Sequence, residues 1–127
     1  DVGIKAYGKN ISETFANAAK GMFDIITDSS EIESVGEYEI KLQAKELEQL
    51  LVDWLSDLLF LNSAKNLVFG FFNVKIDEEN NTLTAHVFGE KYDLSKHKIG
   101  VEIKAVTYHI LEVRKKRPFH VQVLFDI

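Results

Sequence analysis

Residues 45–62 read KELEQLLVDWLSDLLFLN and carry the strongest secondary-structure signal of the chain. Apolar side chains recur there at steps of three and four, which is the spacing of one face of an α-helix. The apolar positions are Leu47, Leu50, Leu51, Trp54, Leu55, Leu58 and Leu59. The stretch therefore predicts the longest helix of the molecule, with one face buried against other elements.

A second helix is predicted over residues 11–26, where Ile11, Phe15, Ala18 and Met22 follow the same spacing. Asn10 stands at the N-cap position. Glu13, three residues later, is placed to reach back to the start of the helix as in a capping box. Both ends of this helix are thus marked in the sequence, because the polar turn at residues 28–30 follows it.

Alternation of apolar and polar residues predicts the strands. They fall in residues 1–8, 38–42, 67–76, 83–87, 101–110 and 119–125. Asn80-Asn81 supplies turn chemistry for one hairpin, and the basic run at 114–118 separates the last two strands as a second hairpin. The apolar parity of 101–110 changes at Val106, which requires either a bulge or bend, or burial of both faces.

The order is strand, helix, strand, helix and then four strands. This order predicts the α+β class, with an antiparallel or mixed sheet packed with two helices. The chain has 127 residues, of which 46% are hydrophobic and 28% charged, as in an ordinary globular protein. We found no linker or repeat, so a single domain over residues 1–127 is expected.

The composition excludes several kinds of site. There is no cysteine, so a disulfide, a thiolate zinc site and a catalytic cysteine are impossible. The longest apolar run, Leu58–Leu61, is too short to cross a bilayer, and the expectation is a soluble, cytoplasmic protein without a membrane partner. The net charge of −5 disfavours autonomous RNA binding and leaves a protein partner, a metal or a small substrate open.

No familiar catalytic motif is present. The sequence lacks a Walker loop, G-x-G-x-x-G, G-x-S-x-G and H-E-x-x-H. The four histidines, His86, His97, His109 and His120, have no metal-ligand spacing and are interpreted as solvent-side residues. The basic run Arg114–Arg117 fits a solvated turn better than a phosphate grip, and the mixed-charge loop at 90–100 fits either a recognition surface or a mobile connection.

The two ends of the chain carry a different signal. If the first and last strands are neighbours, the carboxylates of Asp1 and Asp126 converge with the terminal carboxylate of Ile127. Three hard oxygen donors without sulfur or imidazole suit Ca²⁺ or Mg²⁺ better than zinc. Acidic residues at chain ends are more often exposed and idle, so this pattern alone indicates a cation site only weakly.

The chain resembles the archease family at four places. These are the opening DVGIKAYG (1–8), which His-Thr-Ala normally precedes in the family, the helical stretch LLVDWLSDLLFL (50–61), the segment EIKAVTYH (102–109) and the closing LFDI (124–127). Gly89-Glu90, Asp93 and Lys96-His97 lie between them as the family pattern expects. The resemblance implies that Ile127 is the natural C-terminus.

The resemblance also implies a function. Archeases bind a divalent cation, usually Ca²⁺, with Mg²⁺ or Mn²⁺ as alternatives, through residues that match Asp1, Asp126 and Ile127. They assist the GTP-dependent ligase that joins tRNA halves in tRNA splicing, by accelerating guanylylation of the ligase histidine and multiple turnover. The archease itself is not an enzyme, and it meets RNA only indirectly, through the ligase.

On this interpretation the acidic, metal-loaded end approaches the nucleotide site of the ligase, where positioning and charge neutralisation supply most of the catalysis. Lys104 and His109 are expected to contact the partner or its phosphates. The alternative function is a chaperone-like module that prevents aggregation of a tRNA-modifying enzyme such as a tRNA methyltransferase. A metal-dependent hydrolase is disfavoured because no nucleophile and base pair stands out.

Overall fold

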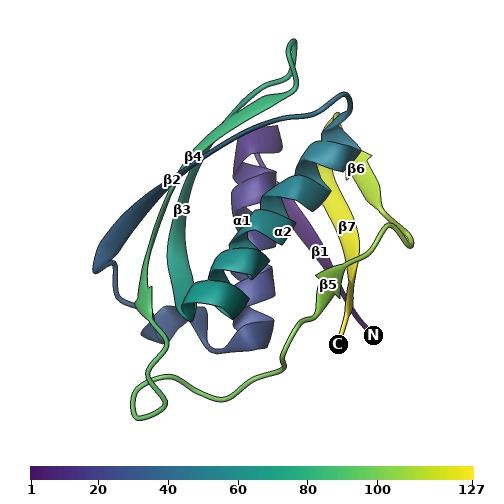
Figure 1. Cartoon of the computed structure of the whole chain (residues 1–127). Helices are drawn as coiled ribbons and strands as arrows, with labels where there is room; N and C mark the ends of the chain where they lie inside the picture. The colour runs from purple at the N-terminus through teal and green to yellow at the C-terminus, as the bar shows by residue number, and fades with distance from the viewer.

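Two antiparallel sheets enclose the two helices of the chain (Figure 1). The computed structural model describes residues 1–127. Its elements are β1 (Val2–Gly8), α1 (Ile11–Ile26), the short 3-10 helix η1 (Ser29–Glu31), β2 (Gly36–Gln43), α2 (Leu47–Lys65), β3 (Leu67–Asp77), β4 (Thr82–Lys91), β5 (Ala105–Val106), β6 (Glu112–Arg114) and β7 (Phe119–Asp126). The α+β class is confirmed. Neither helix combines the length and the apolar character needed to cross a membrane.

The two sheets differ in how far apart in the sequence their paired strands lie. In sheet A, β7 pairs with β1 along one edge and with both β5 and β6 along the other. In sheet B, β4 lies between β2 and β3. The sequence suggested one sheet, but the structure has two, because β7 pairs with the opposite end of the chain while the β3–β4 hairpin pairs with β2.

The start of α1 shows how local sequence fixes an element. The Asn10 side chain accepts a hydrogen bond from the Glu13 N–H at 2.8 Å, as predicted for an N-cap. The Glu13 carboxylate accepts from the Lys9 N–H at 3.0 Å, one residue before the cap. The capping pattern and the apolar spacing together place α1 at the predicted bounds.

The core lies where α1 and α2 meet the inner faces of both sheets. Trp54 of α2 is fully buried, and its indole N–H donates to the Phe15 carbonyl of α1 at 3.0 Å. The same indole packs edge-on against Phe72 of β3, with 6.2 Å between ring centroids. Trp54 therefore joins both helices to sheet B.

The β3–β4 hairpin confirms the predicted turn, and Asn81 adopts a left-handed backbone with φ 50°. Two glycines shape the hairpin further along. The register shifts by one residue around Gly70, where β3 bulges between Phe69 and Phe71. At Gly89, a Cβ atom would lie 1.9 Å from the Val68 carbonyl oxygen, so β3 and β4 approach here at a distance that only glycine permits.

The predicted strand over 101–110 is wrong. Only Ala105–Val106 forms a strand there, while residues 92–104 cross irregularly from sheet B to sheet A. Ile103 alone is buried, at 4% exposure, whereas Tyr108 and Ile110 are 60% and 58% exposed. The alternation of apolar and polar residues over 101–110 therefore does not mark a strand. It belongs to a connection that is held to the core by one apolar side chain, that of Ile103. The hairpin predicted around the basic run does form, between β6 and β7.

Candidate metal and partner-binding site

The two chain ends meet at one end of sheet A. Val2 pairs with Phe125 in the antiparallel β1–β7 ladder, and continuing this register brings Asp1 beside Asp126, which Ile127 follows. Figure 1 shows the N and C labels side by side below β5. The predicted neighbourhood of the first and last strands is thus confirmed.

The donors at this end fit a hard cation. Asp1 and Asp126 are both exposed, and neither side chain is engaged in a hydrogen bond or an ion pair. No three His, Cys, Asp or Glu side chains in residues 1–127 are grouped closely enough to hold a metal ion. The Asp1 and Asp126 side chains are therefore the candidate side-chain ligands at this end, and Ile127, the third predicted ligand residue, follows Asp126 in the chain.

The backbone of Lys104 is held beside this end of sheet A by a hydrogen bond. Its N–H donates to the Asp126 carbonyl at 2.8 Å, and the next residue, Ala105, pairs with Asp126 across β5 and β7. Its ammonium group has no carboxylate partner. Lys104 lines an open hollow of about 300 Å³ together with Ser56, Leu59, Phe60, Ser63, Ala105 and Val106. The structure thus brings Lys104 to the candidate cation site.

His109 occupies a more distant place. It lies exposed in the connection from β5 to β6, and its N–H donates to the Thr107 hydroxyl at 3.3 Å. That hydroxyl in turn donates to the Leu124 carbonyl at 2.9 Å, which ties the connection to β7. No hydrogen bond or ion pair joins His109 to Asp1, Asp126 or Lys104, so the structure does not assemble all the predicted residues into one cluster.

One histidine was misjudged from the sequence. His97 is buried, at 3% exposure, and is not a solvent-side residue. Its Nδ1 accepts from the Asp93 N–H at 2.8 Å, which leaves Nε2 to donate to Glu90 at 3.0 Å. The Lys96 ammonium contacts Glu90 at 2.9 Å and Glu33 at 2.8 Å. We call these contacts among Glu33, Glu90, Asp93, Lys96 and His97 the clasp. The clasp orders the loop at 90–100 and so holds the segment that leads to Lys104.

The charge of Glu90 is strongly stabilised inside the clasp. Burial opposes its ionisation, but hydrogen bonds from the Glu33 N–H, Lys96 and His97 outweigh burial and lower the pKa of Glu90 to about 2. The sequence signals for this arrangement were the run of ionisable residues in the loop and the match of Glu90, Asp93 and Lys96-His97 to the family pattern, and neither signal reveals burial.

We expect Glu90→Gln to lower the free energy of unfolding at pH 7 by about 1–3 kcal/mol, because it weakens charge-assisted hydrogen bonds. Since the folded pKa of Glu90 is depressed, its contribution is present above pH 4.5 and is lost as the pH falls toward 2. Urea unfolding at a series of pH values measures this. Glu33→Gln is the matched control, because Glu33 is 70% exposed and its ion pair with Lys96 contributes little. Equal losses in both variants would contradict the role of the clasp.

The chain is similar to known proteins over its whole length. The sequence matches the Archease protein family (MTH1598/TM1083) over residues 1–127. It is 46% identical over 131 aligned residues to a protein archease of Methanosarcina barkeri, covering 100% of this chain and 90% of that protein. It is 39% identical over 121 residues to a protein archease of Sulfurisphaera tokodaii, covering 95% and 87%.

A solved structure has the same fold. The solution structure of Methanobacterium thermoautotrophicum protein 1598 superposes with a TM-score of 0.82 at 34% identity, covering 100% of this chain and 95% of that one. Family membership supports a cofactor-like role in RNA processing. Matches in sequence and in three dimensions both extend over the chain, which belongs to the archease protein family.

Proposed function

We propose that this chain is a metal-binding protein cofactor that activates an RNA-splicing ligase. It promotes guanylylation of the ligase histidine and allows multiple turnover, and it does not itself catalyse a reaction. The observation that carries the proposal is the β1–β7 register, which sets Asp1 beside Asp126 with the Lys104 backbone hydrogen-bonded to Asp126.

The chain's own residues have three tasks in this proposal. Asp1, Asp126 and the Ile127 carboxylate hold the cation, for which Ca²⁺ fits best and Mg²⁺ or Mn²⁺ are alternatives. A bound divalent cation supplies positive charge next to phosphate oxygens. Lys104 adds a second positive charge beside the same end of sheet A and orients a phosphate of the partner's nucleotide. His109, on the β5–β6 connection, contacts the partner further from the cation.

The surface beside Lys104 suits a protein partner. Phe60 of α2 is 61% exposed and lines the same hollow as Lys104. Aromatic side chains are enriched in protein interfaces, where they often act as anchors. We therefore place the ligase-facing surface around the end of sheet A that carries Asp126.

A guanylylation assay with purified ligase, GTP and divalent metal tests this function. We expect Asp126→Asn to reduce ligase guanylylation to the level without this protein, because it removes an anionic ligand of the cation. Lys104→Ala should reduce the stimulation by about tenfold, because it removes a positive charge that faces phosphate. Calorimetry should show that Asp126→Asn weakens Ca²⁺ binding by about tenfold or more, because one of few anionic ligands is lost.

The matched controls are Glu78→Gln and Lys75→Ala, which change exposed residues on sheet B and its turn. They should stimulate the ligase as the unaltered chain does. Wild-type stimulation by both Asp126→Asn and Lys104→Ala would refute the proposal.

A chaperone-like role remains the second candidate, and the outer face of sheet B favours it. Phe71 is 56% exposed and packs against Phe88, with 5.5 Å between ring centroids. Such a surface could cover apolar regions of a tRNA-modifying enzyme. This role predicts suppression of aggregation that survives Asp126→Asn and is lost in Phe71→Ser, as light scattering of a heated client enzyme would show.

A further inference from the structure

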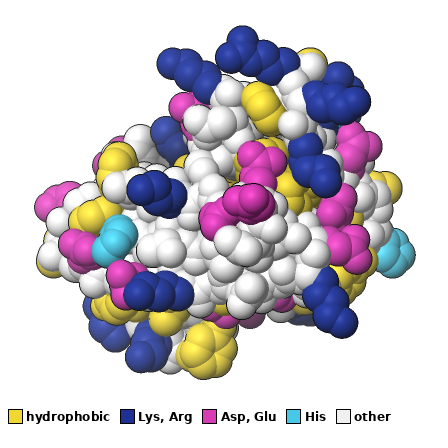
Figure 2. Space-filling model, turned by 90° about the horizontal axis from the view of Figure 1, so that it is seen from above, with side chains coloured by type: hydrophobic (Ala, Val, Ile, Leu, Met, Phe, Trp, Pro, Cys, Tyr) yellow, Lys and Arg dark blue, Asp and Glu magenta, His cyan; other side chains and the backbone are white.

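Positive charge gathers at the end of sheet A opposite the candidate cation site. Five exposed basic residues lie there, Lys9, Arg114, Lys115, Lys116 and Arg117, and a sixth, Lys5, lies midway along β1; none of the six forms an ion pair with a carboxylate. Viewed from this end, Lys and Arg side chains gather along one rim of the surface (Figure 2). The acidic residues beside them are Glu13, which binds the Lys9 N–H, and Glu112, which is paired with His120. The basic charge is therefore in excess here, although the whole chain carries −5.

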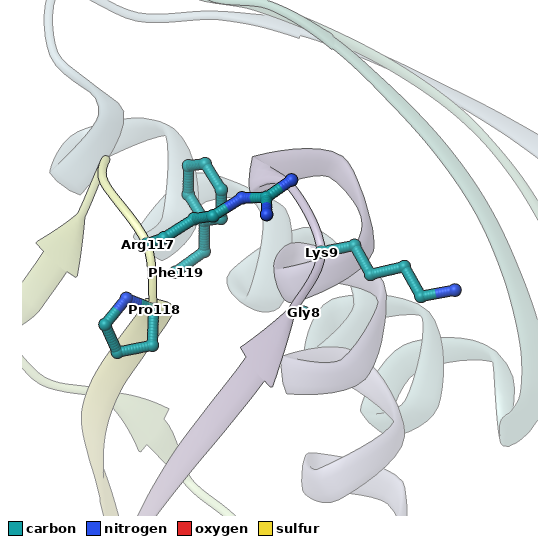
Figure 3. Close-up of a pocket in the computed structure, with 5 residues that line it drawn as sticks. All are labelled: Gly8, Lys9, Arg117, Pro118 and Phe119. Atoms are coloured by element: carbon teal, nitrogen blue, oxygen red, sulfur yellow. The ribbon is translucent and has the colours of Figure 1, made fainter.

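This end is also hollowed. The end of β1 and the start of β7 lie side by side, and an open pocket of about 630 Å³ is lined by Gly8, Lys9, Arg117, Pro118 and Phe119. In Figure 3, the Arg117 side chain reaches from the β6–β7 turn toward the β1–α1 turn, from which Lys9 projects. Two cationic residues from opposite ends of the sequence thus line one hollow, and the Lys9 side chain extends away from Arg117 (Figure 3).

Two rings, those of Tyr7 and His120, lie beside the hollow on the outer face of sheet A. Tyr7 of β1 pairs with His120 of β7, which pairs in turn with Arg114 of β6. Tyr7 is 55% exposed, and its ring lies 5.8 Å from the imidazole of His120. Lys5 and Gln122 form the next row, so basic and polar groups flank the exposed ring on the same face.

We propose that this end of sheet A binds a segment of single-stranded nucleic acid. Its phosphates would follow Lys9 and the Lys115–Arg117 turn, and one base would stack on Tyr7. An open antiparallel sheet that combines an exposed aromatic ring with flanking cations is the arrangement by which proteins hold unpaired bases. A duplex fits less well, because its bases are stacked inside and cannot reach Tyr7.

Two other polyanionic partners fit the surface less well. An anionic membrane would call for several large apolar side chains beside the cations. Ile110, which is 58% exposed, lies near Lys5 and Gln122, but the three most exposed ones, Ile99, Val35 and Leu94, lie outside this face. An acidic protein segment would use the cations and leave Tyr7 without a role. The binding site is independent of the proposed function, because β7 places the basic turn at Phe119 about 24 Å from Asp126 and the Tyr7–His120 pair about 20 Å from it, at about 3.4 Å per residue.

Fluorescence anisotropy of this chain with labelled ten-residue single strands, one of RNA and one of DNA, measures the binding without any ligase. The logarithm of affinity should fall with the logarithm of salt concentration between about 50 and 200 mM, with a slope of about −0.7 for each phosphate contacted. We expect Lys115→Ala/Lys116→Ala to lower affinity at low salt by about tenfold and to reduce the slope by about 1.4. Tyr7→Ala should lower affinity by about tenfold with the slope unchanged, because stacking releases no counterions.

The matched controls lie on the outer face of sheet B: Lys41→Ala/Lys75→Ala for the charges and Phe71→Ala for the ring. They should bind as the unaltered chain does, and circular dichroism should show all variants folded. Binding unaffected by Tyr7→Ala, a slope unaffected by the double lysine variant, or binding to phosphatidylserine vesicles but to neither oligonucleotide would overturn the proposal. Preference for RNA over DNA would identify the polymer, because the 2′-hydroxyl group distinguishes RNA from DNA.

Discussion

Replacing Gly89 with alanine is expected to lower the free energy of unfolding by about 3 kcal/mol or more, the upper range for overpacking a buried position. The added Cβ would lie 1.9 Å from the Val68 oxygen and 2.9 Å from the Phe69 Cα. Both are backbone atoms of β3, so no side-chain rotation relieves the clash. The strands would have to separate where β4 holds sheet B together, and urea or thermal unfolding measures the cost.

Gly36→Ala is the matched control, because Gly36 is the partner of Gly89 on β2. A Cβ atom there would meet the Tyr38 ring at 3.6 Å, an ordinary contact. The expected change is within about 1 kcal/mol. Similar losses from both substitutions would show that the close approach of β3 to β4 at Gly89 is not what requires glycine.

The second large effect is expected at Trp54. Trp54→Ala should destabilise the fold by about 3–5 kcal/mol, because it leaves a cavity where α1, α2 and β3 meet. Trp54→Phe keeps much of the volume but loses the hydrogen bond to the Phe15 carbonyl, so a smaller loss of about 1–2 kcal/mol is expected. Chemical unfolding curves of the three proteins separate the packing contribution from the hydrogen bond.

Phe60→Ala tests whether the loss in the free energy of unfolding depends on burial of the side chain or on its position in α2. Phe60 is on the same helix but is 61% exposed, so its removal should change the stability by about 0.5 kcal/mol or less. If Trp54→Ala were tolerated as well as Phe60→Ala, the role of Trp54 as the junction of helices and sheet would be wrong.

Local signals in the sequence predicted the elements they control. Asn10 and the apolar spacing that follows fix α1 residue by residue, and the Asn80-Asn81 turn fixes the β3–β4 hairpin. The predicted strand over 101–110 failed because alternation there reflects only the anchoring of Ile103. Division into two sheets depends on pairings between distant segments, which no local pattern encodes.

Some residues of the candidate site could likewise be predicted from the sequence, and others could not. The convergence of Asp1 with Asp126 followed from a conditional argument about the two terminal strands, and the structure meets its condition. Lys104 was identified only through family resemblance, and the structure gives it a hydrogen-bonded place at Asp126. The burial of His97 was missed because it depends on Glu90 and Asp93 closing around the ring.

The net charge of the whole chain concealed the basic end of sheet A. The net charge of −5 argued against contact with nucleic acid, and the run Arg114–Arg117 fitted a solvated turn. Folding brings Lys9 to the same end from the other side of the sequence, and Lys5 lies midway along β1. Total charge therefore says little about a protein whose charges are segregated on its surface.

The pairing of β1 with β7 also bears on synthesis in the cell. Val2 finds its partner only when Phe125 has left the ribosome, which at about 5–20 residues per second takes roughly 6–25 s. Until then the edge of β1 is an open template that can recruit other nascent chains. Asp1 and Asp126 flank the Val2–Phe125 pair, so they come together only after β7 has been synthesised and has paired with β1.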